Sequence, residues 1–447
     1  MVDPELVRLR YWPDSRAYYA ALRELPWPVW LDSGFPESGG AYHDVLAADP
    51  YLTLASRDGV TLLDRPGQES QRVLEDPWTL LRGALGEPAA TDTDLPFAGG
   101  AIGFLGYDLA RTSGMLASRP GLPGWPDMAV GLYDWAVVVD HARRRSWFVC
   151  QGRDPRGRQR RQSVLRRLLA VDSPMPTPPG GARWGSVCER GMGSDAYARS
   201  FDRIKHYIRE GDCYQVNLAQ RFRARTPHDA WTLYQRLRLD NPAPYGALLE
   251  YPFGEILSSS PEQFLSVRDR VVQTRPIKGT RPRGHTAEHD AALRAALLSS
   301  PKDRAENLMI VDLLRNDLGK VCEPGSIAVP GLFQVESFAT VHHLVSTVSG
   351  RLRADRDAID LLRAGFPGGS ITGAPKRRAM QIIDELEPVR REAYCGSVIR
   401  LGFDGNLDSS ITIRTLLKRR RDLYYWGGGG IVADSDCAAE YQESLDK

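Results

Sequence analysis

The sequence predicts an α+β protein in which antiparallel strands are mixed with helices. Strand-like and helical patterns follow one another without the regular strand–helix repeat of a doubly wound sheet. Before residue 150, short apolar runs such as 136–139 and 147–149 are bounded by Gly and Pro turns, as in an antiparallel sheet. No segment repeats at a fixed period, and 447 residues suffice to bury a substantial core.

One break in composition divides the chain. Residues 1–170 end in a basic, helix-like stretch over 159–169. Residues 171–185 then read VDSPMPTPPGGARWG, and such a Pro/Gly-rich run is typical of a linker. We therefore expect a linker or surface loop over 171–190, followed by a region with stronger periodic patterns over 191–447.

The second region begins with a predicted helix and strand. Ser194 is a candidate cap for a helix whose apolar residues recur at helical spacing as far as Gly211. Apolar residues then alternate with Gln215 and Asn217, which predicts a half-buried strand with both amides on the face opposite the apolar set.

Later elements are predicted from their end signals. Ser300 followed by Pro301 indicates a helix start, and the helix should run to about Leu318. Pro375 opens another helix. Residues 423–426 are predicted to form a strand and are followed by four glycines. Asp434 and Ser435 are then candidate caps of a final helix.

Composition and charge favour a soluble, cytoplasmic protein. Hydrophobic residues make up 42% of the chain, and the formal net charge is only +2, so little draws the whole molecule toward nucleic acid or membrane. No apolar run approaches the roughly 20 residues of a membrane helix, and the N-terminus lacks a signal-peptide core. The six cysteines are scattered without a CxxC pair, which indicates reduced thiols.

Carboxylates in two predicted helices form the first candidate site. Glu306 lies in the helix that begins near Ser300, and Glu440, Glu443 and Lys447 fall on one face of the last helix. Two helices that each present a carboxylate can hold one Mg²⁺ and leave positions for water and a substrate carboxylate. A solvated helix face with the same spacing is the alternative.

A basic loop forms the second candidate site. Residues 274–284 read TRPIKGTRPRG, in which Lys278 is surrounded by arginines. Like charge disfavours the protonated form of a lysine, and the neutral amine is a nucleophile. A phosphate or nucleic-acid patch, or a solvated loop, would explain the same composition.

Two glycine-rich segments, 365–376 and 427–430, form the third candidate. Bare backbone N–H groups and a following helix N-terminus bind anions. Neither segment matches a phosphate-binding loop or a dinucleotide fingerprint, and tight turns explain them equally well. Together the three candidates indicate a small anion with several carboxylates, a Mg²⁺ ion and a nucleophilic lysine.

These segments, in this order, resemble the chorismate-utilising enzymes, a family that includes anthranilate, isochorismate, salicylate and aminodeoxychorismate synthases. The matching stretches are 211–218 (GDCYQVNL), 258–262 (SSSPE), 276–281 (PIKGTR), 303–309 (DRAENLM), 341–344 (VHHL), 368–376 (GGSITGAPK), 428–435 (GGGIVADS), 96–103 (PFAGGAIG) and 131–135 (GLYDW). The resemblance implies two large stacked antiparallel sheets flanked by helices. It also implies that 191–447, the chorismate-binding catalytic region, forms one interleaved unit with 1–170.

The resemblance also implies roles for individual residues. Glu262 would be the general acid that protonates the departing 4-hydroxyl of chorismate, with His343 and Thr280 close to that hydroxyl. Glu306 and Glu443 would hold Mg²⁺, assisted by Glu440. The remaining substrate-binding set would be Arg414 and Tyr394 at the enolpyruvyl carboxylate, Gly428, Gly429 and Lys447 in a carboxylate cradle, and Gln215, Ser370, Thr372 and Gly373.

Two positions separate the members of the family. Members that add water carry a lysine where this chain has Gln215, and an amide cannot act as a general base near neutral pH. Ammonia needs less activation, so an amine nucleophile fits. Anthranilate synthases usually carry alanine at the position of Lys278, whereas lysine there is the signature of aminodeoxychorismate synthases, in which it is thought to attack C2 of chorismate before ammonia enters at C4.

The resemblance therefore implies Mg²⁺-dependent formation of 4-amino-4-deoxychorismate, for 4-aminobenzoate and folate or for a related antibiotic precursor. Release of ammonia from glutamine needs an amidotransferase, and no Gly-x-Cys-x-Gly nucleophile elbow occurs here. We expect a separate glutaminase subunit in a heterodimer. The alternatives are an anthranilate synthase large subunit and an inactive regulatory or binding paralogue; a nucleic-acid module does not suit the near-neutral charge.

Residues 30–34 (WLDSG) resemble the edge of a pocket that binds tryptophan in this family. Leu31, Asp32 and Ser33 are therefore candidate tryptophan-pocket residues. A buried strand and turn is the alternative explanation.

Overall fold

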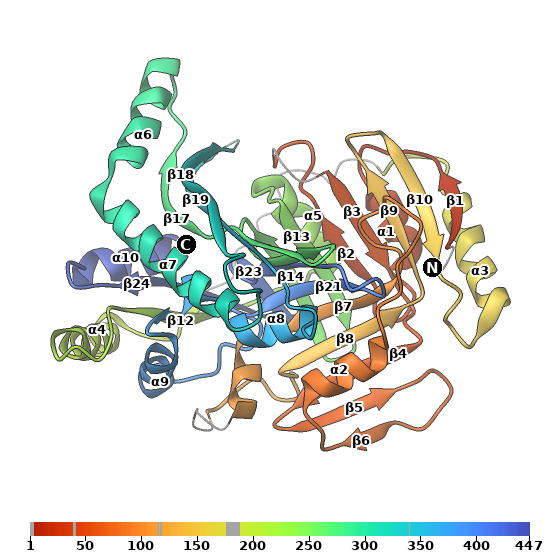
Figure 1. Ribbon diagram of the computed structural model, residues 1–447, viewed down its shortest axis with the longest axis horizontal. Helices are drawn as coiled ribbons and strands as arrows, with labels where there is room; N and C mark the ends of the chain where they lie inside the picture. Colours follow the sequence, from red (N-terminus) through yellow and green to blue (C-terminus); the bar gives the residue numbers. More distant parts are fainter. Residues whose placement is uncertain (1–3, 39–41, 114–115, 117–118, 176–187, 339) are drawn as a thin grey trace.

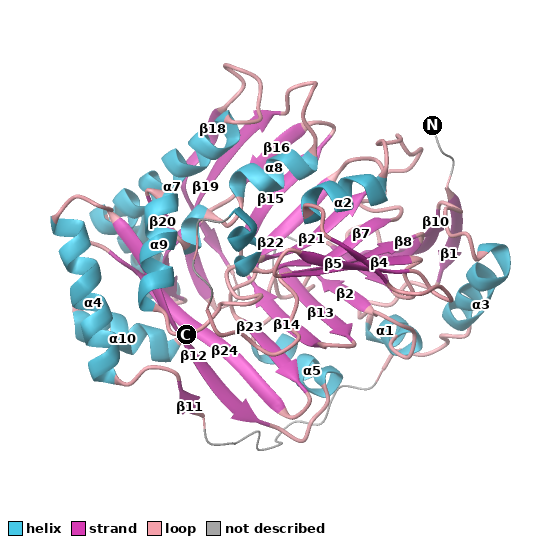
Figure 2. Ribbon diagram, turned by 90° about the horizontal axis from the view of Figure 1, so that it is seen from below, coloured by secondary structure: helices cyan, strands magenta, loops and turns pink. Residues whose placement is uncertain are grey.

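Two large antiparallel sheets, stacked face to face, make up the body of the molecule (Figures 1 and 2). The structure is a computed structural model that describes residues 4–38, 42–113, 116, 119–175, 188–338 and 340–447. Within these residues every strand pairing is antiparallel. The predicted α+β class with two stacked antiparallel sheets is confirmed.

The first sheet takes strands from both ends of the chain. In spatial order they are β1 (Glu5–Leu9), β10 (Arg145–Cys150), β9 (Trp135–Asp140), β3 (His43–Ala47), β2 (Val29–Asp32), β13 (Tyr245–Tyr251), β14 (Gly254–Ser260), β23 (Thr415–Arg419), β24 (Asp422–Ile431), β12 (Gln215–Arg225) and β11 (Glu189–Arg190), with β20 (Gly373–Ala374) also paired to β12. The strands from before residue 150 join the later strands where β2 pairs with β13.

The second sheet is built in the same way. Its order is β17 (Ile277–Pro282), β19 (Val341–Arg351), β16 (Val271–Thr274), β15 (Gln263–Arg268), β22 (Leu407–Ile411), β21 (Ser397–Gly402), β7 (Gly100–Leu105), β8 (Met128–Tyr133), β4 (Leu52–Arg57), β5 (Val60–Asp64) and β6 (Gln71–Val73), with β18 (Ala328–Ser337) also paired to β19. Here β21 pairs with β7, so the two parts of the chain again share one sheet.

Helices flank the sheets. They are α1 (Arg16–Leu22), α2 (Pro77–Leu85), α3 (Gly157–Leu169), α4 (Ser194–Arg209), α5 (Ala230–Asp240), α6 (Ala287–Ser299), α7 (Pro301–Gly319), α8 (Ala358–Gly365), α9 (Lys376–Leu386) and α10 (Cys437–Asp446), with short 3₁₀ turns η1 (Tyr107–Ser113) and η2 (Gly369–Ile371). In Figure 2, α2, α7 and α8 lie on one side of the stack and α1, α3 and α5 on the other. No helix of the described residues is both long and apolar enough to span a bilayer.

The hydrophobic core has two parts. The larger part includes residues of both sheets, such as Leu54, Ile102 and Val216. The smaller part lies under α1, α3 and α5, where Tyr19 stacks on Trp30 at 5.5 Å between ring centroids. Apolar burial stabilises by about 25 cal/mol per Å², so these interiors hold the sheets in fixed positions around the site.

Several predicted element ends differ in the structure. The helix near Ser194 is capped by Gly193, whose backbone is extended, and Ser194 is its first residue. The final helix is capped by Asp436, whose carboxylate accepts from the Ala439 N–H, whereas Asp434 and Ser435 precede it. Ser300 does cap α7, and its hydroxyl accepts from the Asp303 N–H at 3.3 Å.

Two strands also differ from expectation. The predicted half-buried strand is buried on both faces from Gln215 to Gln220, because β12 lies inside the first sheet with β24 and β20 beside it. Strand β24 continues through the four glycines, which the sequence had placed after the strand. Of the predicted linker over 171–190, residues 176–187 lie outside the described residues, and 189–190 form β11.

Candidate active site

One cavity of about 630 Å³ gathers residues from both sheets. Its walls come from β12 and β24 of the first sheet, β17 and β19 of the second, and helices α7 and α10. Thirteen of the predicted catalytic, substrate-binding and metal residues line it: Glu262, Lys278, Thr280, Glu306, His343, Ser370, Tyr394, Arg414, Gly428, Gly429, Glu440, Glu443 and Lys447. Segments nearly 200 residues apart in the chain therefore meet in one place.

Three predicted substrate-binding residues are not among those that line the cavity. Gln215 is fully buried behind the wall, where a Cβ on Gly430 would come within 2.8 Å of its Nε2. Thr372 is also buried, and its hydroxyl donates to the Gly368 carbonyl at 3.0 Å. Gly373 allows β20 to approach β12, since a Cβ there would lie 2.1 Å from the Gln215 carbonyl oxygen. These three residues shape the wall from behind.

Glu262 presents a buried carboxyl to the cavity. It lies between β14 and β15, and its backbone carbonyl accepts from the Ile411 N–H at 3.0 Å. Glu262 is only 5% exposed. Burial raises the pKa of the Glu262 carboxyl to about 7, against the opposing effects of a hydrogen bond from Ser370 and the charge of Lys278. Near neutral pH this group can therefore both hold and release a proton, as a general acid must.

Lys278 lies on β17 and lines the same cavity as Glu262. Burial lowers the pKa of its amine, while the charges of Glu306 and Glu262 act in the other direction. A lowered pKa increases the neutral, nucleophilic fraction of the amine.

The arginines around Lys278 are not the cause of this shift. Each is paired with its own carboxylate: Arg275 with Glu336, Arg281 with Asp303 at 2.8 Å, and Arg283 with Asp290 at 2.7 Å. The expectation that like charge from these arginines depresses the pKa of Lys278 was wrong in its cause. Desolvation at the cavity wall has the largest effect.

His343 and Thr280 form a hydrogen-bonded pair across two strands. They are register partners on β19 and β17, and the Thr280 Oγ1 lies 2.8 Å from His343 Nδ1. Burial, with Arg414 as a further cause, lowers the pKa of His343 to about 4. The imidazole is therefore neutral near pH 7 and can serve as a polar contact rather than a cation.

Arg414 and Tyr394 offer cationic and neutral polar groups to the cavity. Arg414 lies in the turn between β22 and β23 in a left-handed backbone conformation (φ 50°). Tyr394 stacks on Trp426 at 6.1 Å between centroids. Burial raises the pKa of the Tyr394 hydroxyl well above its ordinary value, so it stays protonated.

Three carboxylates face the cavity from α7 and α10. Glu440 and Glu443 both lie against Gly429, where a Cβ would come within 3.0 Å of Glu440 Oε2 and 3.5 Å of Glu443 Oε1. Lys447 Nζ lies 2.6 Å from Glu443 Oε1, and Lys302 Nζ lies 4.0 Å from Glu306 Oε1. Burial raises the pKa of Glu306.

Glu306, Glu440 and Glu443 are oxygen donors of the kind that Mg²⁺ prefers. In the described part of the chain, however, no three His, Cys, Asp or Glu side chains are gathered closely enough to hold a metal ion. The three carboxylates are chemically suited to bind a divalent ion. In this structure Lys447 pairs with Glu443, and Lys302 lies near Glu306.

Several residues of the cavity wall were not predicted from the sequence as site residues, among them Asn217, Trp426 and Tyr425. Alternation along β12 had placed Asn217 on the same face as Gln215, which was the available signal. Its Nδ2 is buried without a hydrogen-bond partner in the described residues. Trp426 and Tyr425 precede the glycines, and because β24 runs on through them, all belong to one wall.

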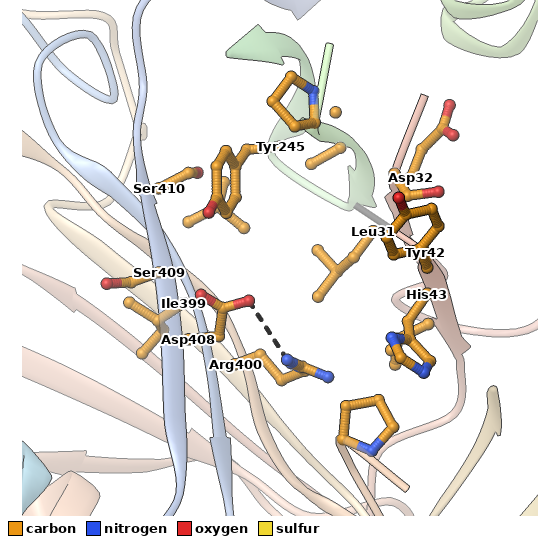
Figure 3. Close-up of a pocket in the computed structure, with 17 residues that line it drawn as sticks. Leu31, Asp32, Tyr42, His43, Tyr245, Ile399, Arg400, Asp408, Ser409 and Ser410 are labelled. Atoms are coloured by element: carbon orange, nitrogen blue, oxygen red, sulfur yellow. Dashed lines mark hydrogen bonds and ion pairs between the residues drawn. The ribbon is translucent and has the colours of Figure 1, made fainter. Parts of the chain in front are cut away.

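The candidate tryptophan-pocket residues line a second, smaller cavity of about 270 Å³ (Figure 3). Figure 3 shows Leu31, Tyr42 and His43 facing Tyr245, Ser409 and Ser410 across it, with the ion pair of Arg400 and Asp408 (3.3 Å) below. The Asp32 carboxylate accepts from Arg238 at 2.7 Å and from Tyr234 at 3.2 Å, neither of which lines the cavity. Asp408 also lines the cavity, and its oxygens accept from Gln263 Nε2 and from Arg400 Nη2, both at 3.3 Å.

Comparison with known proteins accounts for this arrangement. The model of the chorismate binding enzymes matches residues 30–447. The chain belongs to the family of chorismate-binding enzymes. The recognition made from the sequence is thereby confirmed, and the chain is an enzyme of this chorismate-using family.

Individual members of the family are similar over nearly their whole length. Aminodeoxychorismate synthase component 1 of Klebsiella aerogenes is 48% identical over 100% of this chain and 98% of its own. The Escherichia coli K12 protein of the same name is 43% identical over 100% of this chain and 97% of its own. Anthranilate synthase component 1 1 of Haloarcula marismortui is 37% identical over 96% and 87%.

Solved structures of family members share the architecture. Anthranilate synthase component I from Streptococcus pneumoniae superposes with a TM-score of 0.82 at 32% identity, covering 92% of both chains. The menaquinone-specific isochorismate synthase from Escherichia coli, at 17% identity and a TM-score of 0.72 over 100% of this chain and 93% of its own, shares the fold alone.

Proposed function

We propose that this enzyme converts chorismate and ammonia to 4-amino-4-deoxychorismate. Full-length relatives at 43–48% identity carry the name aminodeoxychorismate synthase component 1. The single observation that carries the proposal is Lys278, whose amine lines the cavity with Glu262 and has its pKa lowered by burial. A nucleophile and a proton donor thus face the same space.

The two residues divide the first half of the reaction. The neutral Lys278 amine attacks C2 of chorismate, the ring double bonds shift to C1–C6 and C4–C5, and the C4–O bond breaks. The hydroxyl leaves as water with the proton of Glu262, whose pKa of about 7 leaves much of it protonated near neutral pH. The proton that the lysine nitrogen loses returns Glu262 to its acid form.

Ammonia completes the reaction at C4. It forms the new C4–N bond, the double bonds return to C1–C2 and C5–C6, and the C2–N bond to Lys278 breaks. The C2-bound nitrogen takes the proton of Glu262 as it leaves, so that Lys278 is released as a neutral amine, and the new C4 ammonium group returns a proton to Glu262. The enolpyruvyl ether at C3 is untouched. His343 and Thr280, joined by their 2.8 Å contact, would lie beside the departing hydroxyl as neutral hydrogen-bonding groups.

The other lining residues would bind the two carboxylates of chorismate. Arg414 and Tyr394 would hold the enolpyruvyl carboxylate, and the wall around Gly428 and Gly429, with Lys447, would receive the ring carboxylate. Glu306 and Glu443, with Glu440, would hold Mg²⁺, which neutralises the ring carboxylate when bound. Lys447 would then exchange its pairing with Glu443 for the substrate.

Gln215, which is buried behind the cavity wall, argues against a reaction in which water attacks chorismate. Gln215 stands where water-adding members carry lysine, and both of its side-chain polar atoms lack a partner among the described residues. An amide offers no basic lone pair near neutral pH. Salicylate and isochorismate synthesis therefore lack their base here.

Ammonia would come from a separate glutaminase subunit in a heterodimer. The name component 1 carried by the relatives supports a second component. The smaller cavity would hold a tryptophan, whose ring would lie among Leu31, Val45 and Tyr245 and whose charged groups would face Arg400 and Asp408.

The product identifies the reaction. We would incubate the enzyme with chorismate, Mg²⁺ and an ammonium salt without glutamine and analyse the products by mass spectrometry. The proposal requires an amine that retains the enolpyruvyl group. Anthranilate with an equivalent of pyruvate would establish the alternative, anthranilate synthase, and no turnover with retained chorismate binding would indicate a regulatory paralogue.

A further inference from the structure

A buried ion pair lies directly behind the cavity wall. Glu387 follows α9, and Arg391 lies four residues further on; their side chains meet through Arg391 Nε and Glu387 Oε2 at 2.9 Å and through Nη2 and Oε1 at 2.7 Å. Arg391 is 1% exposed and Glu387 5%. Neither residue lines the cavity.

The pair is bonded to the backbone of two wall segments. Arg391 Nη2 donates to the Asn217 carbonyl at 2.8 Å, and Nη1 donates to the Ile371 carbonyl at 3.0 Å. Glu387 Oε1 accepts from the Ala219 N–H at 2.8 Å. Strand β12 and turn η2 are thereby fixed to the same charged group.

A third wall segment packs on the same guanidinium. The Arg391 guanidinium lies 5.8 Å from the Tyr394 ring centroid, and the Tyr394 N–H donates to the Arg391 carbonyl at 2.9 Å. Asn217, Ile371 and Tyr394 all line the cavity. The Arg391 side chain thus contacts β12, η2 and the ring of nearby Tyr394, and each of these three segments contributes a residue to the wall.

Stability alone is a weak reason for this arrangement. The desolvation of a buried ion pair offsets much of its attraction, and apolar replacements of similar volume often serve as well. A planar guanidinium, in contrast, fixes several acceptors in set directions. The geometry here uses that property on Asn217 and Ile371.

We propose that Arg391 and Glu387 are positioning residues that hold Asn217 and Tyr394 in the orientation that binds substrate. Asn217 presents an amide nitrogen that is buried without a partner in the described residues, and this group donates to an oxygen of the substrate. This inference rests on chorismate being the substrate of the cavity, as proposed above.

The neighbouring arginine provides a matched control. Arg390 is 5% exposed and pairs with Asp58 at 2.6 Å and Asp127 at 3.3 Å, and none of these residues lines the cavity. Arg390→Lys and Arg391→Lys therefore make the same chemical change at two adjacent, buried positions. Lysine keeps the charge but cannot bond two carbonyls with the geometry of the guanidinium.

The test measures chorismate affinity, by titration calorimetry without ammonia, beside the thermal unfolding midpoint. We expect Arg391→Lys to weaken chorismate binding by about 10-fold or more, since small misplacements of binding groups cost this much, and to raise KM more than it lowers kcat. Arg390→Lys should change binding by less than about 2-fold although its unfolding midpoint falls similarly. Equal effects of both variants on binding would show a merely structural role and overturn the inference.

A double-mutant cycle tests the route through Asn217. If Arg391 acts by placing Asn217, Arg391→Lys should weaken binding less in an Asn217→Ala background than in the parent. Strict additivity would contradict that route. If Arg391→Lys does not fold, Glu387→Gln with Asp127→Asn as its control carries the same comparison. A parent that binds no chorismate would instead refute the proposed function itself.

Discussion

Substitution of Glu262 by Gln separates two consequences of burying a carboxyl at the active site. Glutamine keeps the shape of the side chain but cannot donate a proton to the departing hydroxyl. General acid catalysis contributes about 10²- to 10⁴-fold, so kcat should fall by that factor. The parent should also show an inflection near pH 7 in its pH–rate profile, from the Glu262 pKa of about 7, and the variant should lack it.

The same substitution should stabilise the protein at neutral and alkaline pH. The folded-state pKa of Glu262 is raised from 4.5 to about 7, so the folded protein holds this proton more tightly than the unfolded chain. Stability from this group is present below pH 4.5 and is lost as the pH rises to about 7. A rise in pKa from 4.5 to about 7, at about 1.4 kcal/mol for each pH unit, corresponds to about 3 to 4 kcal/mol. The Glu262→Gln variant has no carboxyl group at this position, so its free energy of unfolding does not fall in this way as the pH rises.

Chemical denaturation at two pH values measures the effect. The free energy of unfolding of Glu262→Gln should exceed that of the parent by less than about 1 kcal/mol at pH 5 and by about 3 to 4 kcal/mol at pH 8. Glu255→Gln is the control, since burial also raises the pKa of Glu255, but its carboxylate pairs with Lys418 at 3.5 Å and lies outside the cavity. That variant should keep the parental kcat. A fully active Glu262→Gln protein without a pH-dependent stability gain would refute the reasoning.

Three further changes test other parts of the site. Lys278→Ala should lose about 100-fold or more in kcat while calorimetry shows unchanged Mg²⁺ and chorismate binding; a native rate would exclude the covalent route. Glu443→Gln should weaken Mg²⁺ binding by about 10-fold or more, measured with Mn²⁺ as a spectroscopic probe, and unchanged affinity would remove Glu443 from the metal site. Asp408→Asn should abolish the rise in unfolding temperature that added tryptophan produces in the parent, whereas an equal rise in both proteins would place tryptophan elsewhere.

Local signals in the sequence were sufficient for much of the fold. Ser300 and Pro301 mark the start of α7 because a hydroxyl cap and a proline both suit a first helical turn. The glycines after Trp426 were harder to place, since glycine usually weakens a strand. Here they continue β24 because a Cβ on Gly428 would lie 2.3 Å from the Leu218 carbonyl oxygen of the neighbouring strand. Only the pairing of β24 with β12 reveals that requirement.

In the candidate site, too, some features could be predicted from the local sequence, whereas others depend on contacts between distant segments. Residue types and motifs were enough to select Glu262, Lys278 and Glu306, which the fold brings to one cavity. The cause of the shifted pKa of Lys278 could not be read from the loop, because the partners of its arginines come from distant elements such as β18 and α7. Arg391 left no local signal either, since its contacts with Asn217 and Ile371 span 174 and 20 residues.

The identity of the aminated product tests the central claim most directly. With ¹⁵N-labelled ammonium, chorismate and Mg²⁺, the account predicts a product that carries the label and retains the enolpyruvyl ether, with no release of pyruvate. The label should be bonded to C4 of the ring, as nuclear magnetic resonance can establish. Labelled anthranilate with an equivalent of pyruvate, or a hydroxylated product without label, would contradict the assignment of Lys278 and Gln215.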